Sequence, residues 1–363
     1  MSSTVYFASA QVASLEAGST LPAKFGRLLA KHKLAKLVAG KSVAIKIHFG
    51  GDIGFTTIHP LFIGILVKAV KDAGGRPFLT DGSPALAGAR TRGYTEEVIG
   101  CPVLPAAGFN EKYLYTKKVS FKTLKQVEIT GQVADADVLI NFSHVKGHGA
   151  CGYGGACKNL AMGCVSSHTR HAIHQLEGGL TWHEKDCLHC RKCVKACRTG
   201  AMTMSDDGKL DIFFHNCIYC QHCVTACPKH AISIDSTGFT SFQKGMAIAT
   251  REVLSFFGPE SVLHINLLLN VTMLCDCWGF STPSIVPDIG IMSSTDLVAI
   301  ERASLDLIKV EDLLPNGLPK DRKLRDEGTH LFERIHGKDP FVQLGMLEAE
   351  RLGTQKYKLV DVG

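Results

Sequence analysis

The stretch ADVLINF, residues 136–142, is apolar nearly throughout. A strand with one face in water alternates apolar and polar residues, so this continuous pattern predicts a strand that is covered on both faces. Upstream, HPLFIGILVKAVKDAGG at 59–75 predicts a helix, and RPFLTDG at 76–82 predicts the strand that follows it. Strands that alternate with helices predict an α/β fold, in which a mainly parallel twisted sheet carries helices on both faces.

The stretch SVAIKIHF at 42–49 predicts a strand whose two faces differ. Successive side chains of a strand point to opposite faces, so the valine and isoleucines share one face while Lys46 and His48 share the other. Open α/β sheets place their ligand sites at the carboxyl ends of strands. Lys46 and His48 are therefore candidate catalytic residues of such a site, and Asp81 and Asp288, which end or follow strands, could complete it.

The same alternation resumes near the C-terminus. SVLHINLLLNV at 261–271 predicts a strand, and SSTDLVAIERASLDLIK at 293–309 predicts a helix capped near Ser294 or Thr295. A further helix and strand are expected in the last residues. The α/β pattern thus lies on both sides of a central segment of a different kind.

Two cysteine runs mark this central segment. CLHCRKCVKAC at 187–197 and CIYCQHCVTAC at 217–227 both read Cys-x2-Cys-x2-Cys-x3-Cys, the ligand spacing of bacterial ferredoxins that carry 4Fe-4S clusters. The fourth cysteine of each run faces the neighbouring cluster, so the runs exchange their last ligand. Cluster one is expected to be bound by Cys187, Cys190, Cys193 and Cys227. Cluster two is expected to be bound by Cys217, Cys220, Cys223 and Cys197.

The region around the runs predicts a small α+β ferredoxin-like module. Between them, GAMTMSDDGKLDIFFHN predicts two short strands around a turn at Asp207 and Gly208, and HAISID predicts another after the second run. Zinc is an alternative ligand of four thiolates, although zinc cysteines usually come in separated pairs. Arg198 follows the first run where the pattern expects proline, and this cation is expected to raise the potential of cluster two; the alternative is a solvated arginine at a helix end.

These patterns define the expected domains. One α/β domain is formed by residues 1–180 and 239–363, and it is interrupted by the two-cluster module at 181–238. In a second reading, residues 239–363 form a separate small α/β domain.

A stretch rich in glycine and histidine precedes the module. Glycines of GHGACGYGGACKNLAMG let backbone N–H groups approach an anion closely, and Lys158 adds positive charge. Imidazoles can donate protons near neutral pH and ligate metals, so His144 and Lys158 are candidate catalytic residues. His171 and His174 are three residues apart and could share one helical face. The alternative interpretation is a set of tight turns with surface histidines.

Six of the fourteen cysteines lie outside the two runs. A turn at Asp276, at the end of the strand predicted before it, would let Cys275 and Cys277 grip one metal. We expect Cys275, Cys277 and Cys164 to line a third metal or redox site, with Cys157 or a histidine as a further member. The alternative is that these are buried free cysteines, which pack like small apolar residues.

Two longer blocks carry a resemblance to a known family. SHVKGHGACGYGGACKNLAMGC at 143–164 and CDCWGFSTPSIVPDIGIMSSTDLVAIERA at 275–303, with the cysteine runs between them, resemble the iron–sulfur proteins of the family called domain of unknown function 362. The resemblance covers most of the chain. It implies an α/β core with an inserted ferredoxin module and a redox role, but no substrate. Where similar sequences tend to end one block in aspartate, this chain has Glu301.

The expected function is electron transfer. Two 4Fe-4S clusters would relay single electrons to a substrate or third redox centre in the α/β body, as in a ferredoxin-linked iron–sulfur oxidoreductase. In an alternative reading, the protein is a non-catalytic electron carrier or redox subunit whose α/β body docks partner proteins. A cluster-based sensor or scaffold is a third reading.

Composition bounds the partners and the location. Fourteen cysteines in 363 residues favour metal or redox chemistry over a disulfide framework. A net charge of +6 without a basic run interleaved with aromatics gives little support to nucleic-acid binding. The cations of CRKCVKACR could instead steer an acidic ferredoxin- or flavodoxin-like partner, and an anionic small molecule could occupy the pocket. With no signal peptide or membrane-spanning segment, a cytoplasmic protein without a membrane partner is expected.

Overall fold

The computed structural model describes residues 2–51, 53–82, 85–177, 179–214, 216–217, 220–234, 239–320 and 322–363. Its centre is an eight-stranded sheet with the order β16-β1-β15-β14-β7-β2-β3-β4. In chain order the strands are β1 (Ser3–Ser9), β2 (Ser42–Lys46), β3 (Arg76–Asp81), β4 (Val103–Pro105), β7 (Val138–His144), β14 (Val262–Leu268), β15 (Gly290–Ser294) and β16 (Tyr357–Asp361). Neighbouring strands of this sheet are parallel except where β15 pairs with β1 and β14. The expected mainly parallel sheet is confirmed.

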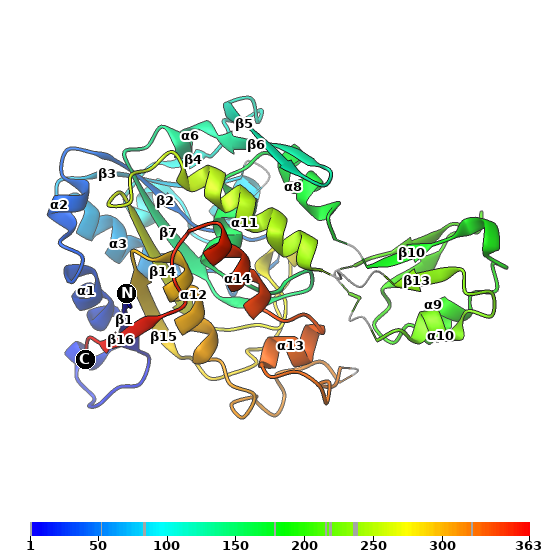
Figure 1. The fold of residues 1–363 in the computed structure, drawn as a ribbon. Helices are drawn as coiled ribbons and strands as arrows, with labels where there is room; N and C mark the ends of the chain where they lie inside the picture. The colour runs from blue at the N-terminus through cyan, green and yellow to red at the C-terminus, as the bar shows by residue number, and fades with distance from the viewer. Residues whose placement is uncertain are drawn as a thin grey trace.

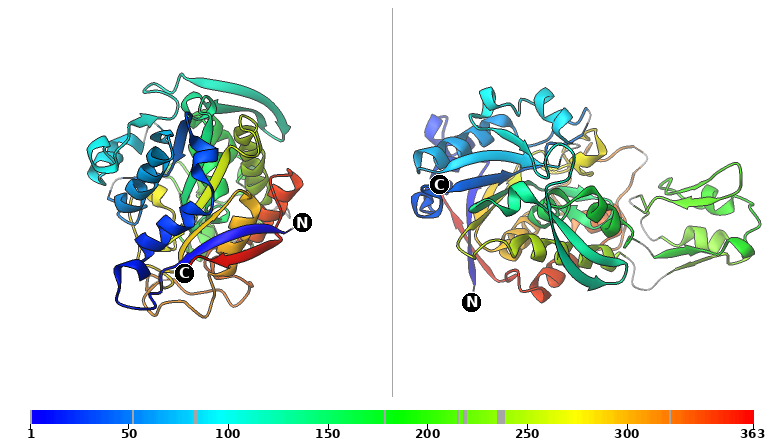
Figure 2. Two further views of the ribbon diagram at one scale, coloured as in Figure 1. Left: turned by 90° about the vertical axis from the view of Figure 1, so that its left-hand side faces the viewer. Right: turned by 90° about the horizontal axis from the view of Figure 1, so that it is seen from above.

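Helices cover both faces of the sheet (Figures 1 and 2). On one face lie α1 (Leu21–Ala30), α2 (Leu34–Val38), α3 (Pro60–Asp72) and α5 (Glu96–Ile99). On the other lie α7 (Ala156–Gly163), α11 (Thr240–Leu254), α12 (Leu297–Asp306) and α14 (Phe341–Ala349). The remaining helices of the body are α4 (Leu86–Thr91), α6 (Gly131–Ala134), α8 (Ser167–His174) and α13 (Leu331–His336), with the 3-10 turns η1 (Ala17–Ser19) and η4 (Asp276–Trp278).

The two faces of β2 differ as its sequence predicts. Val43, Ile45 and Ile47 are fully buried in the apolar core beneath α1 and α3. Lys46 points to the opposite face, towards α7, and is also fully buried. The central strand β7 is buried along its whole length, as its apolar sequence predicts.

The helix α12 begins later than its sequence predicts. Its N-cap is Asp296, whose Oδ1 accepts from the N–H groups of Val298 and Ala299, both at 2.9 Å. The expected cap Ser294 instead donates its hydroxyl to the carbonyl of Thr4 in the neighbouring strand. A carboxylate that reaches two unpaired N–H groups caps a helix start well, so the prediction of Ser294 or Thr295 was wrong by one or two residues.

The cysteine-rich segment has its own small sheets and projects from the body (Figure 1). Its elements are β10 (Leu180–Trp182), η3 (Glu184–Asp186), α9 (Lys192–Ala196), β11 (Met202–Met204), β12 (Leu210–Ile212), α10 (His222–Ala226) and β13 (Ile232–Ile234). Strand β10 pairs with β13 and β11 pairs with β12, both antiparallel. The eight-stranded sheet takes strands from both sides of this segment. We call the segment, residues 179–234 as described, the cysteine module.

Two antiparallel hairpins complete the body. They are β5 (Leu114–Phe121) with β6 (Leu124–Thr130), and β8 (Lys146–His148) with β9 (Gly152–Gly154). Within the described residues, no helix is both long enough and apolar enough to span a bilayer.

Candidate functional site

A cavity of about 800 Å³ opens at the carboxyl ends of the parallel strands β2, β3 and β7. The cavity is lined by seven residues that the sequence singled out as members of one site: Lys46, His48, Asp81, His144, Lys158, Cys275 and Cys277. His171 and His174 also line it, and they lie on one face of α8, as their spacing predicts. The carboxyl edge of an open α/β sheet is where ligand sites are expected, because the loops that leave parallel strands meet there.

A buried ion pair forms the floor of this cavity. The ammonium of Lys46 lies 2.8 Å from Oδ1 of Asp81, and both side chains are almost fully buried. Lys46 also donates to Oδ1 of Asn159 at 2.7 Å. Burial alone would raise the pKa of Asp81, but the charges of Lys46 and His48 hold it well below its usual range. Lys46 is therefore held in place by several acceptors and positions its neighbours, rather than reaching out to a ligand.

His48 presents a ring nitrogen to the cavity. Its Nδ1 lies 3.0 Å from Oδ2 of Asp81, which orients the ring. Its Nε2 is buried and has no hydrogen-bond partner among the described residues. Burial lowers the pKa of His48, and Asp81 partly opposes this effect. A buried nitrogen without a partner is costly unless a ligand or water meets it, so His48 has a ring nitrogen available to a ligand in the cavity.

A second buried carboxylate, Asp276, organises the loop after β14. Lys146 forms a salt bridge to its Oδ2, and His144 donates to the same oxygen from Nδ1 at 3.0 Å. His144 also donates from Nε2 to the carbonyl of Leu269 at 2.8 Å. Both ring nitrogens therefore face acceptors, which fixes the orientation of the ring. Burial alone would raise the pKa of Asp276, but Lys146 and His144 hold it well below its usual range. His144 thus positions Asp276.

Cys275 and Cys277 lie on either side of Asp276 and form a disulfide at the cavity wall. The turn η4 between them is the turn that the sequence predicted for Asp276. Lys158, in the first turn of α7, donates to Sγ of Cys277 at 3.2 Å. Burial, aided by the charge of Lys146, lowers the pKa of Lys158 to about 8.

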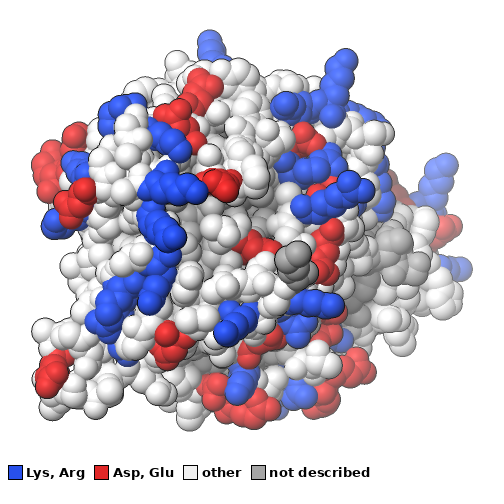
Figure 3. All heavy atoms as spheres, turned by 60° about the vertical axis from the view of Figure 1, so that its left-hand side comes forward, with Lys and Arg blue, Asp and Glu red and all other residues white. Residues whose placement is uncertain are grey.

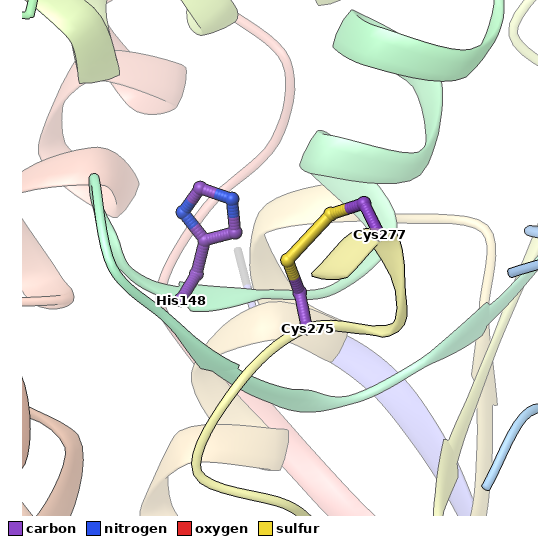
Figure 4. Close-up of side chains that lie close together, drawn as sticks. All are labelled: His148, Cys275 and Cys277. Atoms are coloured by element: carbon purple, nitrogen blue, oxygen red, sulfur yellow. A yellow bond between two sulfur atoms is a disulfide. The ribbon is translucent and has the colours of Figure 1, made fainter. Parts of the chain in front are cut away.

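The imidazole of His148, at the end of β8, faces the two sulfur atoms (Figure 4). Among the described residues, His148, Cys275 and Cys277 form a group that could hold a metal ion, with ligand atoms that all lie within 4.8 Å of one another. Nδ1 of His148 accepts from the N–H of Ala150 at 3.1 Å, which fixes the ring. The histidine expected as a further member of this site is therefore His148.

The glycine-rich stretch allows close packing against buried charges. A Cβ at Gly163 would lie 2.3 Å from the ammonium of Lys46, and a Cβ at Gly155 would lie 2.4 Å from Oε2 of Glu301. Glu301 is fully buried, and its Oε1 accepts from the N–H of Cys157, the second residue of α7, at 2.7 Å. Burial raises the pKa of Glu301 to about 7. These glycines make room for protein charges rather than for a bound anion.

Some expected site residues lie elsewhere. Cys157 and Cys164 are fully buried in the apolar core and are not members of the group that could hold a metal. Asp288 is exposed in the loop before β15, where it accepts from the N–H of Asn270 at 2.7 Å. It does not line the cavity, because the loop that carries it folds back on the preceding turn.

The cysteine module brings its eight run cysteines into two sets. One small cavity is lined by Cys187, Cys190, Cys193 and Cys227. Another is lined by Cys197, Cys217, Cys220 and Cys223. The halves are related locally: Arg191 and Gln221 follow the second cysteine of each run, and both have left-handed backbone conformations. Backbone N–H groups donate to sulfur at Cys187 and Cys227, at 3.3 and 3.2 Å.

The module reaches the large cavity through aromatic residues. Phe213 and Phe214, which follow β12 and precede Cys217, line the cavity wall. The ring of Phe213 meets that of Trp278 edge to face, with centroids 5.6 Å apart. Lys338 of the body is buried and donates to the carbonyl of Phe214 at 2.9 Å. The aromatic contact therefore leads from the module to the residue next to Cys277.

Comparison with known proteins fits this geometry. The family model named Domain of unknown function (DUF362) matches residues 43–306. The chain belongs to this family. The matched residues of this chain include the ends of β2, β3 and β7, the cysteine module and the loop with Cys275 and Cys277. No curated protein matches the sequence.

One similar solved structure is the lactate racemase apoprotein from Thermoanaerobacterium thermosaccharolyticum. The two are 12% identical, with a TM-score of 0.33, over 74% of this chain and 51% of that one. The chain thus spans about half the length of that protein. At this level the likeness carries no argument about activity.

The sequence analysis did not identify several residues at or beside the large cavity. Asp276 was considered only as a turn, and Asn159, which binds both Lys46 and Asn141, was not singled out. The available signals were weak: Asp276 lies between two cysteines, and Asn159 lies inside a family block. Nothing local in the sequence connects Phe213 to Trp278, because that contact depends on how the module meets the body.

Proposed function

We propose that the protein is an iron–sulfur oxidoreductase, in which two 4Fe-4S clusters in the cysteine module pass single electrons to the cavity of the α/β body. The observation that carries this proposal is the sorting of eight cysteines into two sets of four around two separate cavities. Each set combines three cysteines of one run with the last cysteine of the other. This is the crosswise ligand exchange that the ferredoxin spacing implies.

The residues present fit such clusters. Each set supplies four thiol donors, and N–H groups point at the sulfur of Cys187 and Cys227. Hydrogen bonds of this kind stabilise thiolates that carry the negative charge of a cluster. When bound, the clusters would supply one-electron transfer. Four thiols also suit zinc, so metal analysis belongs to the test.

The cavity supports a catalytic role over that of a passive carrier. Nε2 of His48 has no partner among the described residues, and the ammonium of Lys158 makes no ion pair with a described carboxylate. A hydrogen-bonding nitrogen and a cation in one cavity fit a small anionic substrate. In this role His48 and Lys158 bind the substrate, while Lys46, His144 and Asp276 hold the surrounding strands and loop in place.

An acidic electron-transfer protein is the proposed partner. Arg191, Lys192, Lys195 and Arg198 are exposed on the cysteine module. Arg198 also lines a cleft beside Cys220, together with Arg322 and Lys323 of the body. On the face of the body in Figure 3, by contrast, positive and negative side chains are interspersed. Local cations beside the clusters would steer a ferredoxin- or flavodoxin-like donor towards them.

The test is metal analysis of anaerobically purified and reconstituted protein. We expect about eight iron atoms per chain, with visible absorption and paramagnetic signals on reduction. Cys190→Ser and Cys220→Ser should each remove about half of the iron, because each removes a ligand of one cluster only. Cys101→Ala, which changes a buried cysteine outside both sets, is the matched control and should retain all of it.

Two outcomes would contradict the proposal in different ways. A colourless protein that contains zinc alone removes the electron-transfer role. Full iron content with no turnover of any anionic substrate, and no effect of His48→Ala or Lys158→Met on electron transfer, favours the non-catalytic carrier instead.

A further inference from the structure

The disulfide between Cys275 and Cys277 is the feature that the proposed function leaves unused. It encloses a single residue, so it removes little conformational freedom from the unfolded chain. A structural cross-link at this place would therefore contribute little stability. Intracellular disulfides that do not serve stability are usually transient and take part in redox chemistry.

We propose that Cys275 and Cys277 form a reversible dithiol–disulfide couple that stores two electrons beside the substrate cavity. The proposal rests on the proposed function, because the two clusters would deliver these electrons one at a time. The site would therefore convert one-electron transfer in the module into two-electron chemistry in the body. Its substrate class is a small anionic molecule that is reduced or oxidised by two electrons.

The positions of the two sulfur atoms suit different tasks. Cys277 is exposed, whereas Cys275 is 1% exposed. Thiol–disulfide exchange requires an accessible sulfur that a nucleophile can reach and a second thiol that resolves the product. Cys277 is the sulfur that a substrate or partner thiol can reach, and Cys275 is placed to resolve the mixed disulfide.

The surroundings favour the reduced form. Lys158 donates to Sγ of Cys277 at 3.2 Å, and an adjacent ammonium stabilises a thiolate. Asp276 anchors the residue between the cysteines through Lys146 and His144, so the loop remains in position when the S–S bond opens. The buried charge network around Asp276 thus gives both redox states the same backbone.

The reduction balances as follows. The S–S bond accepts two electrons and breaks, and two protons from solvent or cavity side chains yield the thiols of Cys275 and Cys277. The two electrons would be supplied one at a time by the clusters that the two sets of cysteines would hold. Oxidation by the substrate returns both electrons and both protons to the substrate and reforms the S–S bond.

An aromatic contact lies between the module and the loop that carries the disulfide. Cys217, a ligand of cluster two in the proposed function, follows Phe213 and Phe214 closely in the chain. Phe213 contacts Trp278, whose neighbour in the sequence is Cys277. This ring contact joins the module to the disulfide loop and is the route that we propose for the electrons.

The first experiment measures the couple by itself. The protein is equilibrated with ratios of reduced and oxidised dithiothreitol, quenched with acid, and alkylated; the peptide with Cys275 and Cys277 is then weighed by mass spectrometry. We expect a single two-electron transition in which the peptide gains either no label or two labels. Lys158→Met should make reduction about tenfold less favourable, which corresponds to about 30 mV. Lys68→Met, an exposed lysine on α3, is the control and should leave the transition unchanged.

The second experiment tests delivery by the clusters. A light-driven one-electron donor reduces the reconstituted protein, and iron content, paramagnetic signals and peptide labelling are read from the same sample. Wild type should gain two labels on this peptide, and Cys190→Ser should gain them much more slowly because one cluster is missing. Cys275→Ser/Cys277→Ser should keep its iron and gain no label at these positions.

The possible failures are distinct. Normal iron signals with a peptide that never forms a disulfide, or that stays unlabelled while the clusters are reduced, overturn the couple and leave the proposed function standing. A reversible disulfide in a chain that binds no iron overturns the proposed function and leaves the dithiol–disulfide couple standing. One extra metal ion per chain that Cys275→Ser removes, with thiols that never oxidise, assigns His148, Cys275 and Cys277 to a metal site and also overturns the couple.

Discussion

The cysteine module and the α/β body both have cavities lined by cysteines, but the lining residues come together from different distances along the sequence. In the module, each cavity draws its cysteines from two runs that are close in the sequence. In the body, the cavity combines residues from Lys46 at the end of β2 to Trp278 after β14. Short spacing determines the first site, whereas the second exists only once the sheet has formed.

The two regions also differ in what stabilises them. The body contains two buried ion pairs, Lys46 with Asp81 and Lys146 with Asp276, beneath an apolar sheet. The apolar core of the module is small and includes the cysteines themselves. Small modules of this kind depend on bound metal for stability, because they bury too little apolar surface. Changes to buried charge should therefore affect the body first, and loss of metal should affect the module first.

The largest effect is expected from Asp276→Ala. This change leaves the buried ammonium of Lys146 and the imidazole of His144 without their carboxylate, which typically costs about 3–5 kcal/mol. Chemical denaturation of the body should show the loss, while the iron content of the module stays unchanged. If iron is lost together with stability, the two regions do not behave independently.

Glu301→Gln tests the buried carboxyl group of α12 that accepts a hydrogen bond from the first turn of α7. Burial raises the pKa of Glu301 from 4.5 to about 7, so the folded chain binds this proton more tightly than the unfolded chain. Its contribution is fully present below about pH 4.5, and stability falls as the pH rises towards 7, by up to about 3 kcal/mol. Glutamine keeps an acceptor for the N–H of Cys157 but cannot ionise. The variant should lose this part of the pH dependence in denaturation curves; an unchanged slope contradicts the assignment.

A smaller effect is expected from Gly163→Ala. The added methyl group would meet the ammonium of Lys46, which three acceptors hold in place. Overpacking of this kind costs about 1–3 kcal/mol. Gly64→Ala in α3 is the matched control: its methyl group meets nothing within 4 Å and should stabilise the helix by about 0.5–1 kcal/mol. Similar melting temperatures for the two variants would show that Lys46 is free to move.

The smallest effect is expected from the exposed cations of the module. Lys195→Gln and Arg198→Gln should slow reduction by an acidic electron donor at low salt, and the difference should shrink as ionic strength rises. Stopped-flow rates across a salt series provide the measurement. Rates that do not depend on salt would remove electrostatic steering.

The fold could be predicted because the pattern of apolar residues within each strand indicates which of its faces are buried. The continuous apolar pattern of 136–142 requires cover on both faces, and β7 has that cover. The alternation in 42–49 separates apolar side chains from Lys46, as found. The same periodicity also placed Lys46 and His48 at the strand end that opens into the cavity.

Other parts of the site could not be predicted in this way. Asp288 lies in the loop just before β15, and this loop turns its carboxylate to the N–H of Asn270. Cys164 lies in a family block, yet its position at the end of α7 places it in the apolar core. The direction of a side chain in a loop, or around a helix end, depends on contacts that are distant in sequence. Asp276 was missed for the same reason, since its partners Lys146 and His144 come from another strand and hairpin.

The pairing of β14 with β7 has a consequence for protein synthesis. Strand β7 is made before the cysteine module, and its partner β14 is made after it. During synthesis, the edge of β7 that pairs with β14 therefore remains unpaired until the module has emerged from the ribosome. The nascent chain exposes this apolar strand edge during that time. The module needs only its own contiguous residues to fold, so it can take up metal first. If the module binds iron as proposed, a slow supply of metal should leave more chains with an unfinished sheet and should increase their aggregation.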